Sequence, residues 1–150
     1  MQELINILKN RELTISCAES LTAGLFASTM GEYSGVSKVF KGGVVSYWNE
    51  IKQSVLNVPE SVILSSGVVS SECASYMARG VKELFKTDVS VSFTGNAGPE
   101  VMEGKPVGLV YIGLCINQTT FSFEYYFKGT RNEIRKQCVI EATKKLIELL

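Results

Sequence analysis

The chain contains no histidine, and this absence limits the chemistry that its hydroxyl and amine side chains can perform. It excludes the Ser-His-Asp triad, the Cys-His dyad and the common histidine-containing zinc sites. A general base must then be Lys, Asp, Glu or Tyr. Ser20 stands where a predicted buried strand (residues 13–18) turns into a predicted helix (residues 21–30). That position exposes a side chain at the carboxyl edge of a sheet, where Ser20 could be a nucleophile or only a helix N-cap.

Lys52 is a candidate base for Ser20. It falls on the first turn of a helix that we expect to begin with Asn49 as its cap and to reach about Leu56. If the two preceding strands are neighbours, its amine can reach the same sheet edge as Ser20. Burial lowers the pKa of a lysine, so a desolvated Lys52 could act as a neutral base near pH 7. The alternative is a solvated helix lysine.

Two other segments could line a site at that edge. Residues 94–99 follow a predicted strand over residues 88–93, and Gly95 and Gly98 there allow the backbone to approach a ligand closely. Arg131, with Arg135 one turn later, begins the last predicted helix, where arginine beside free N–H groups suits phosphate binding. The alternatives are an ordinary loop and surface arginines. No P-loop or Gly-x-Gly-x-x-Gly motif is present.

The elements that must position these residues alternate between helix and strand. Apolar spacing predicts helices over residues 2–10 and 70–86, and a capping box at Thr130 and Glu133 opens a terminal helix that reaches Leu150. A second capping-box spacing, Asn57 to Glu60, indicates a short helix. Strand material occurs at residues 39–48 and 88–93, and a hairpin is expected from residues 110–116 and 120–127. This pattern predicts an α/β domain with a mixed sheet covered on both faces.

Composition fits one cytoplasmic domain of 150 residues. Fifteen basic and fifteen acidic residues cancel, so we expect no nucleic-acid partner. No apolar run approaches a membrane span and the N-terminus lacks a signal-peptide pattern, so we expect no membrane association. The four cysteines are widely spaced, as expected of reduced, buried residues.

Together and in order, five motifs resemble those of the CinA C-terminal domain family. They cover nearly the whole chain and comprise residues 18–24 (AESLTAG), residues 40–52 with Gly42-Gly43-Val44-Val45-Ser46-Tyr47, Asn49 and Lys52, residues 67–80, residues 94–108 with Thr94-Gly95-Asn96-Ala97-Gly98-Pro99 and Lys105-Pro106-Val107-Gly108, and residues 127–135 with Arg131 and Arg135.

The resemblance implies a single domain with a three-layer α/β/α fold and a homo-oligomer, a dimer or larger. It implies a stand-alone amidohydrolase that converts nicotinamide mononucleotide to nicotinic acid mononucleotide and ammonia, with no metal or organic cofactor. The family's catalytic serine and lysine correspond to Ser20 and Lys52. We expect secondary or oxyanion roles for Thr22, Tyr47, Thr94 and Gly95, and substrate or phosphate contacts from Gly24, Gly43, Asn49, Asn96, Gly98, Lys105, Arg131 and Arg135.

The chain departs from the family pattern at three places. Ala23 replaces a glycine, Asn96 replaces an isoleucine, and residues 100–104 (EVMEG) replace a glycine-rich link with a more acidic one. Acid near a phosphate site opposes phosphate binding. Two alternatives to catalysis therefore stay open: a nucleotide-binding or regulatory module, and a protein-interaction role in a stress or DNA-uptake pathway.

Overall fold

A mixed five-stranded sheet in the order β2-β1-β3-β4-β5 runs through the middle of the protein. We describe it from a computed structural model that covers residues 1–150. β1 pairs in parallel with β2 and β3, whereas β4 pairs antiparallel with β3 and with β5. The predicted mixed sheet and terminal hairpin are confirmed. The strands are β1 (Ile15–Glu19), β2 (Phe40–Val45), β3 (Val89–Gly95), β4 (Leu109–Ile116) and β5 (Thr119–Tyr126).

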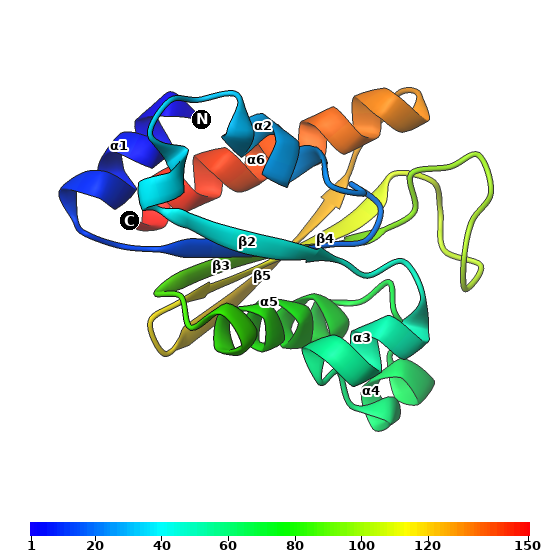
Figure 1. Ribbon diagram of the computed structural model, residues 1–150. Coiled ribbons are helices and arrows are strands. Elements are labelled where there is room, and N and C mark those ends of the chain that lie inside the picture. Colours follow the sequence, from blue (N-terminus) through cyan, green and yellow to red (C-terminus); the bar gives the residue numbers. More distant parts are fainter.

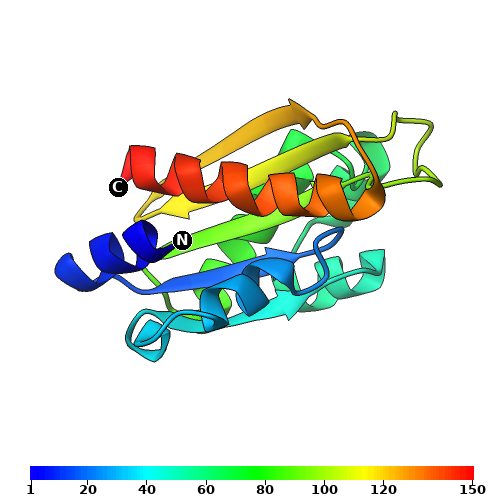
Figure 2. The ribbon, with the colours of Figure 1, turned by 90° about the horizontal axis from the view of Figure 1, so that it is seen from above.

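Helices cover both faces of the sheet and give the three layers (Figure 1). One face carries α1 (Gln2–Asn10), α2 (Leu25–Gly31) and α6 (Arg131–Leu149), which lie side by side in the view of Figure 2. The other face carries α3 (Asn49–Leu56), α4 (Glu60–Ser65) and α5 (Ser71–Phe85), and a short 3-10 turn (Val36–Lys38) precedes β2. None of the helices combines the length and apolar character that a membrane span requires.

The two faces of the central strand β3 carry different kinds of side chain. Its odd-numbered apolar residues enter the larger core, between the sheet and α1, α2 and α6. Its even-numbered hydroxyls face α5 instead, and each donates to a backbone carbonyl on that side. The distances from the donating oxygens are 2.6 Å for Ser90 to Ala78, Ser92 to Ala74, and Thr94 to Val68. These buried hydroxyls are therefore satisfied by the backbone of α5 and of the segment just before it, which must lie very close to the sheet.

Glycines permit this close packing. A Cβ atom at Gly113 of β4 would collide with the carbonyl oxygen of Ala74 in α5. A Cβ at Gly80 of α5 would collide with the carbonyl oxygen of Leu56, the last residue of α3. Gly80 therefore fixes how closely α5 approaches the end of the short helix α3.

The segment after β1 differs from the prediction. We expected a helix directly from residue 21, but α2 begins at Leu25 with Gly24 in the N-cap position. Ala23 and Gly24 both have positive φ, 47° and 90°, so this segment is a turn. The alanine that replaces a family glycine therefore occupies the left-handed region, which L-residues other than Gly seldom adopt.

Two predicted helix starts are wrong and two are confirmed. Asn49 is the first residue of α3 rather than its cap, because Trp48 occupies the N-cap position without a side-chain bond. Asn57 is the left-handed C-cap of α3 and opens no capping box, but the short helix expected after it is confirmed as α4, which begins at Glu60 with Pro59 as its N-cap. Ser70 caps α5 by accepting from the Cys73 N–H, and the capping box at Thr130 is complete.

The strand β2 ends at Val45, so the predicted strand material up to Trp48 extends three residues too far. All four cysteines are buried and unpaired.

The Gly80 contact predicts opposite signs for two helical Gly→Ala substitutions. Gly80→Ala should lower the free energy of unfolding by about 1–3 kcal/mol, because the methyl group overpacks against a backbone carbonyl that cannot move without α3. Gly31→Ala, in α2, meets no atom within 4 Å and should leave stability equal or raise it by up to about 1 kcal/mol. Urea unfolding of both variants checks this. Equal effects of the two substitutions would contradict the packing role of Gly80.

Candidate active site

Three parallel strand ends bring the candidate residues to one sheet edge. Backbone bonds extend the pairing beyond the strands: the Ser20 N–H donates to the Phe93 carbonyl (3.0 Å) and the Ser46 N–H donates to the Glu19 carbonyl (2.8 Å). Ser20 and Ser46 therefore stand in adjacent positions just past β1 and β2. Only 4% of Ser20 is exposed. Its location agrees with the sequence prediction, but its role as an N-cap does not, because Gly24 holds that position of α2.

Lys52 extends from α3 to this edge and is fully enclosed, with 1% of its surface exposed. Its Nζ donates to the Ser20 Oγ at 3.2 Å, to the Ser46 carbonyl at 2.7 Å and to the Tyr47 carbonyl at 3.2 Å. The sequence alternative of a solvated helix lysine is therefore wrong. Three acceptors match the three N–H groups of an ammonium.

The three partners of Lys52 are not equivalent. The two carbonyl oxygens can only accept a hydrogen bond, whereas the Ser20 hydroxyl can also donate one. A neutral amine has two N–H groups and one lone pair. If Lys52 loses a proton, it can keep both carbonyl bonds and turn its lone pair toward the Ser20 hydroxyl. That is the geometry a general base needs.

Burial also lowers the pKa of Lys52 from its ordinary value of 10.5. Desolvation is the main cause, because it disfavours the ammonium form. The charges of Cys73 and Glu103 act in the opposite direction and are weaker. The net shift favours the neutral amine, which is the form that can accept a proton.

Glu19, the residue before Ser20, holds the turn that follows. Its carboxylate is buried and accepts from the N–H groups of Phe26 (3.1 Å) and Ala27 (2.9 Å). Those are the second and third residues of α2, so Glu19 satisfies the positive end of this helix. These N–H groups of α2 are therefore occupied within the protein and are not free to bind an oxyanion. The sequence analysis missed this role, although an acid shortly before a helix is a known capping signal.

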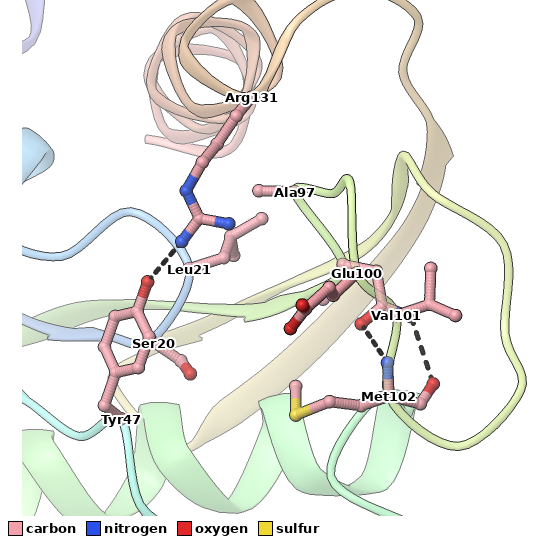
Figure 3. A pocket seen from close by; sticks show the side chains of 10 residues that line it. Ser20, Leu21, Tyr47, Ala97, Glu100, Val101, Met102 and Arg131 are labelled. Atoms are coloured by element: carbon pink, nitrogen blue, oxygen red, sulfur yellow. Dashed lines mark hydrogen bonds between the residues drawn. The ribbon is translucent and has the colours of Figure 1, made fainter.

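Ser20 opens into a pocket of about 260 Å³ (Figure 3). Arg131 spans one wall: it donates to the Gly98 carbonyl at 2.8 Å and to the Tyr47 hydroxyl at 2.7 Å. The expected residues Ser20, Tyr47 and Arg131 thus meet here, although they come from distant parts of the chain. The complete lining is Ser20, Leu21, Tyr47, Gly95, Asn96, Ala97, Glu100, Val101, Met102 and Arg131.

The opposite wall is the loop between β3 and β4, which extends beyond the sheet edge in Figure 1. Asn96 organises this loop. Its side-chain amide donates to the carbonyls of Met102 (3.2 Å) and Lys105 (3.0 Å) and accepts from the Met102 N–H (3.0 Å). Asn96 lines the pocket, as expected of a ligand-contacting residue, but its amide groups are engaged by the loop itself.

Lys105 is directed away from the pocket. Its Nζ donates to the carbonyls of Ser66 (3.1 Å) and Val69 (2.6 Å) and to Glu103 (3.0 Å). Glu103 in turn accepts from the N–H groups of Val68 and Val69. These bonds hold its pKa below the ordinary value for a glutamate, although burial alone would raise it. Lys105 and Glu103 together clamp the loop to the segment before α5.

The remaining expected residues do not line the pocket. Arg135 donates to the Thr22 carbonyl at 2.8 Å and fixes the turn after Ser20. Thr94 binds the Val68 carbonyl and therefore secures β3. Thr22 keeps a buried hydroxyl without a partner. Gly24, Gly43 and Asn49 also lie outside the lining, and Gly98 takes part through its carbonyl.

The sequence analysis missed several residues at and around the pocket, among them Ser46, Glu100 and Met102. Ser46 supplies a carbonyl to Lys52, and its buried hydroxyl has no partner. Glu100 and Met102 line the pocket, but their segment stood out in the sequence only as a departure from the family pattern. No group of three or more Cys, Asp or Glu side chains in the structure could hold a metal ion.

Comparison with known proteins gives a consistent result. The model of the CinA C-terminal domain matches residues 1–150. A Bacillus thuringiensis (strain Al Hakam) protein named "Putative competence-damage inducible protein" is 51% identical over 134 residues, which are 89% of this chain and 32% of that protein. The chain thus spans about a third of the length of this curated relative.

Two solved structures share the whole fold. The competence damage-inducible protein A of Klebsiella pneumoniae is 28% identical, with a TM-score of 0.96 over 98% of this chain and 92% of that chain. The competence/damage inducible protein CihA of Agrobacterium tumefaciens is 34% identical, with a TM-score of 0.94 over 99% and 92%.

The capping role of Glu19 predicts a loss of stability in Glu19→Gln. One of its two acceptor oxygens becomes an amide NH₂ group, which cannot accept a hydrogen bond from the buried helix N–H it faces, so the free energy of unfolding should fall by about 1–3 kcal/mol. Glu133→Gln is the matched control: Glu133 also caps a helix but is exposed, and glutamine fits a capping box. Denaturant unfolding should show the larger loss at Glu19. The reverse order would contradict the assignment.

Proposed function

Because the chain belongs to the CinA C-terminal domain family, we propose that it hydrolyses the carboxamide of nicotinamide mononucleotide to nicotinic acid mononucleotide and ammonia. The observation that carries this proposal is the buried contact between the Lys52 Nζ and the Ser20 Oγ, 3.2 Å apart at the inner end of the pocket. A hydroxyl beside a desolvated amine is a recognised way to activate a serine without histidine. The substrate itself follows from the family resemblance.

The first half of the proposed reaction forms an acyl-enzyme. The Ser20 oxygen attacks the carboxamide carbon while Lys52 takes the hydroxyl proton. The tetrahedral intermediate then collapses, and Lys52 returns that proton to the departing nitrogen, which leaves as ammonia. The two carbonyls of Ser46 and Tyr47 hold the amine in place in both protonation states.

The second half repeats the sequence with water. Water attacks the acyl carbon and gives a proton to Lys52, and the second intermediate expels the Ser20 oxygen, which regains the proton. Nicotinic acid mononucleotide is released and the pair returns to its starting state. No group other than water is consumed.

Backbone N–H groups beside Ser20 are the best candidates for oxyanion stabilisation. The N–H groups of Leu21 and Thr22 donate no hydrogen bond within the protein, and these residues directly follow the nucleophile. The Asn96 N–H, at the other wall, is bound to the Leu109 carbonyl and is not free. This difference favours the N–H groups beside Ser20 over the Asn96 N–H as the oxyanion donors.

Arg131 is the proposed contact for the 5′-phosphate. Its guanidinium is already oriented by Gly98 and Tyr47, and it keeps N–H groups that are free to bind phosphate oxygens. Lys105 and Arg135 are bound elsewhere, so we no longer assign them to the phosphate. The homo-oligomer implied by the family resemblance stays a prediction.

Substitution of either member of the pair should abolish the reaction without unfolding the protein. Ser20→Ala should lower the rate of ammonia release from nicotinamide mononucleotide by at least about 10³-fold, because the nucleophile is lost. Lys52→Met, which keeps the side-chain length but no base, should lower it by about 10²- to 10⁴-fold. Ser54→Ala, an exposed serine on the same helix as Lys52, is the control and should retain full activity.

Full turnover by Ser20→Ala would refute this mechanism. Binding of the nucleotide by the wild type without any ammonia release would instead favour the alternative of a nucleotide-binding or regulatory module. Isothermal calorimetry beside the ammonia assay separates these outcomes.

The rate should also depend on pH through Lys52. The neutral amine is the active form, so kcat/KM should rise with pH and reach half its maximum below pH 10.5, since burial lowers the Lys52 pKa. Lys52→Arg should show neither the activity nor this rise, because arginine does not lose its proton. A rate that falls as pH rises from 6 to 9 would contradict a lysine base.

A further inference from the structure

One carboxylate in the pocket has no partner in the protein. Glu100 lines the pocket, and Figure 3 shows its side chain directed into the cavity, toward the side occupied by Ser20 and Arg131. It forms no hydrogen bond and no ion pair; the ion pairs of the protein are Lys105–Glu103, Lys144–Glu141 and Lys145–Glu148. Its charge is therefore available to a ligand.

The loop backbone directs Glu100 into the cavity. The Asn96 side chain, which precedes Glu100 in the chain, binds the backbone of Met102 and of Lys105, which follow it, so the short segment around Glu100 is closed into a loop. Arg131 binds the Gly98 carbonyl from the other side. A side chain on a segment held at several points is a defined part of the wall.

Glu100 and Arg131 give the pocket charges of opposite sign on facing walls (Figure 3). Arg131 is held by neutral partners, a carbonyl and a tyrosine hydroxyl, so its positive charge is not cancelled within the protein. A ligand that fills the space between them gains most if it carries both a cationic and an anionic group. A ligand with only a negative charge meets repulsion from Glu100.

We infer that Glu100 is a specificity residue that selects amides whose ring is positively charged, so that the pocket takes zwitterionic amides with the cation at Glu100 and the anion at Arg131. This inference rests on the proposed function, in which the reacting carboxamide is attached to the ring and must reach Ser20. Glu100 points toward the side of the cavity where Ser20 lies, so a ring held there would face its carboxylate. Its positive charge then faces the unpaired carboxylate.

The same charge affects the product. Hydrolysis replaces a neutral carboxamide with a carboxylate, which stays beside Ser20 until it leaves. Glu100 repels this new negative charge and therefore weakens product binding relative to substrate binding. The Glu100 carboxylate thus favours substrate binding by attracting the ring cation and disfavours product binding by repelling the product carboxylate.

The test compares two ligands that differ in ring charge but share the carboxamide and phosphate: nicotinamide mononucleotide and its reduced, dihydropyridine form. Calorimetry in the Ser20→Ala background measures the Kd of each without turnover. We expect the oxidised form to bind more tightly than the reduced form. The Kd ratio used below is the Kd of the reduced form divided by the Kd of the oxidised form. Glu100→Gln should lower this ratio by about fivefold, as expected for a solvent-accessible charge pair.

Two further variants control the result. Glu100→Asp keeps the charge and should retain most of the preference. Glu32→Gln removes the same charge from an exposed residue at the end of α2 and should leave the ratio unchanged. An unchanged ratio in Glu100→Gln, or an equal fall in Glu32→Gln, would overturn the inference.

The design separates this inference from the hydrolase proposal. If the wild type releases no ammonia but Glu100→Gln still lowers the Kd ratio, the hydrolase proposal fails and the charge selection stands for a binding site. If ammonia is released and the ratio does not change, the hydrolase stands and the inference fails. Failure of both ligands to bind would overturn both.

Discussion

The enclosed amine of Lys52 is the interaction on which the site depends. An unpaired ammonium inside a protein is costly, so each of its N–H groups requires a partner. Two of those partners are backbone carbonyls just beyond β2, and they exist only because the chain leaves the strand at Val45 and reverses into α3. The third is Ser20. The position of α3 is set in turn by α5, since Gly80 lets the two helices touch through the Leu56 carbonyl. Packing far from the pocket therefore decides where the amine lies.

Two of the three departures from the family pattern, Asn96 and residues 100–104, form one local arrangement in the loop between β3 and β4. Asn96 supplies hydrogen bonds that residues 102 and 105 of this loop require, and an isoleucine would supply none. The acidic Glu103 is neutralised by Lys105 and by backbone N–H groups away from the pocket. Of the two acids in the replaced link, only Glu100 lines the cavity. The two acidic residues of this segment thus have different roles: Glu103 anchors the loop, and Glu100 lines the cavity.

Sequence reasoning located the elements and the central pair, and it failed where roles depend on contacts across the fold. Periodicity and capping signals were sufficient for α1, α5 and α6, and the exclusion of histidine directed attention to lysine. The turn at Ala23 could not be predicted, because alanine gives no local signal for positive φ. Nor could the partners of Lys105, since the Ser66 and Val69 carbonyls lie far away in sequence. In the sequence alone, a lysine that binds a phosphate cannot be distinguished from one that, like Lys105, connects two loops.

The hydroxyls of β3 also set a limit on how the layers can be arranged. Residues two apart on a strand are separated by about 6.7 Å, and residues four apart on a helix by about 6.0 Å. The two repeats nearly coincide, so Ser90 and Ser92 can reach carbonyls one turn apart on α5. The next hydroxyl along the strand, that of Thr94, donates to the Val68 carbonyl instead, which precedes α5 because the helix begins at Ser71. The repeats of the strand and the helix therefore match over only a short length, and this match fixes how α5 is aligned along β3.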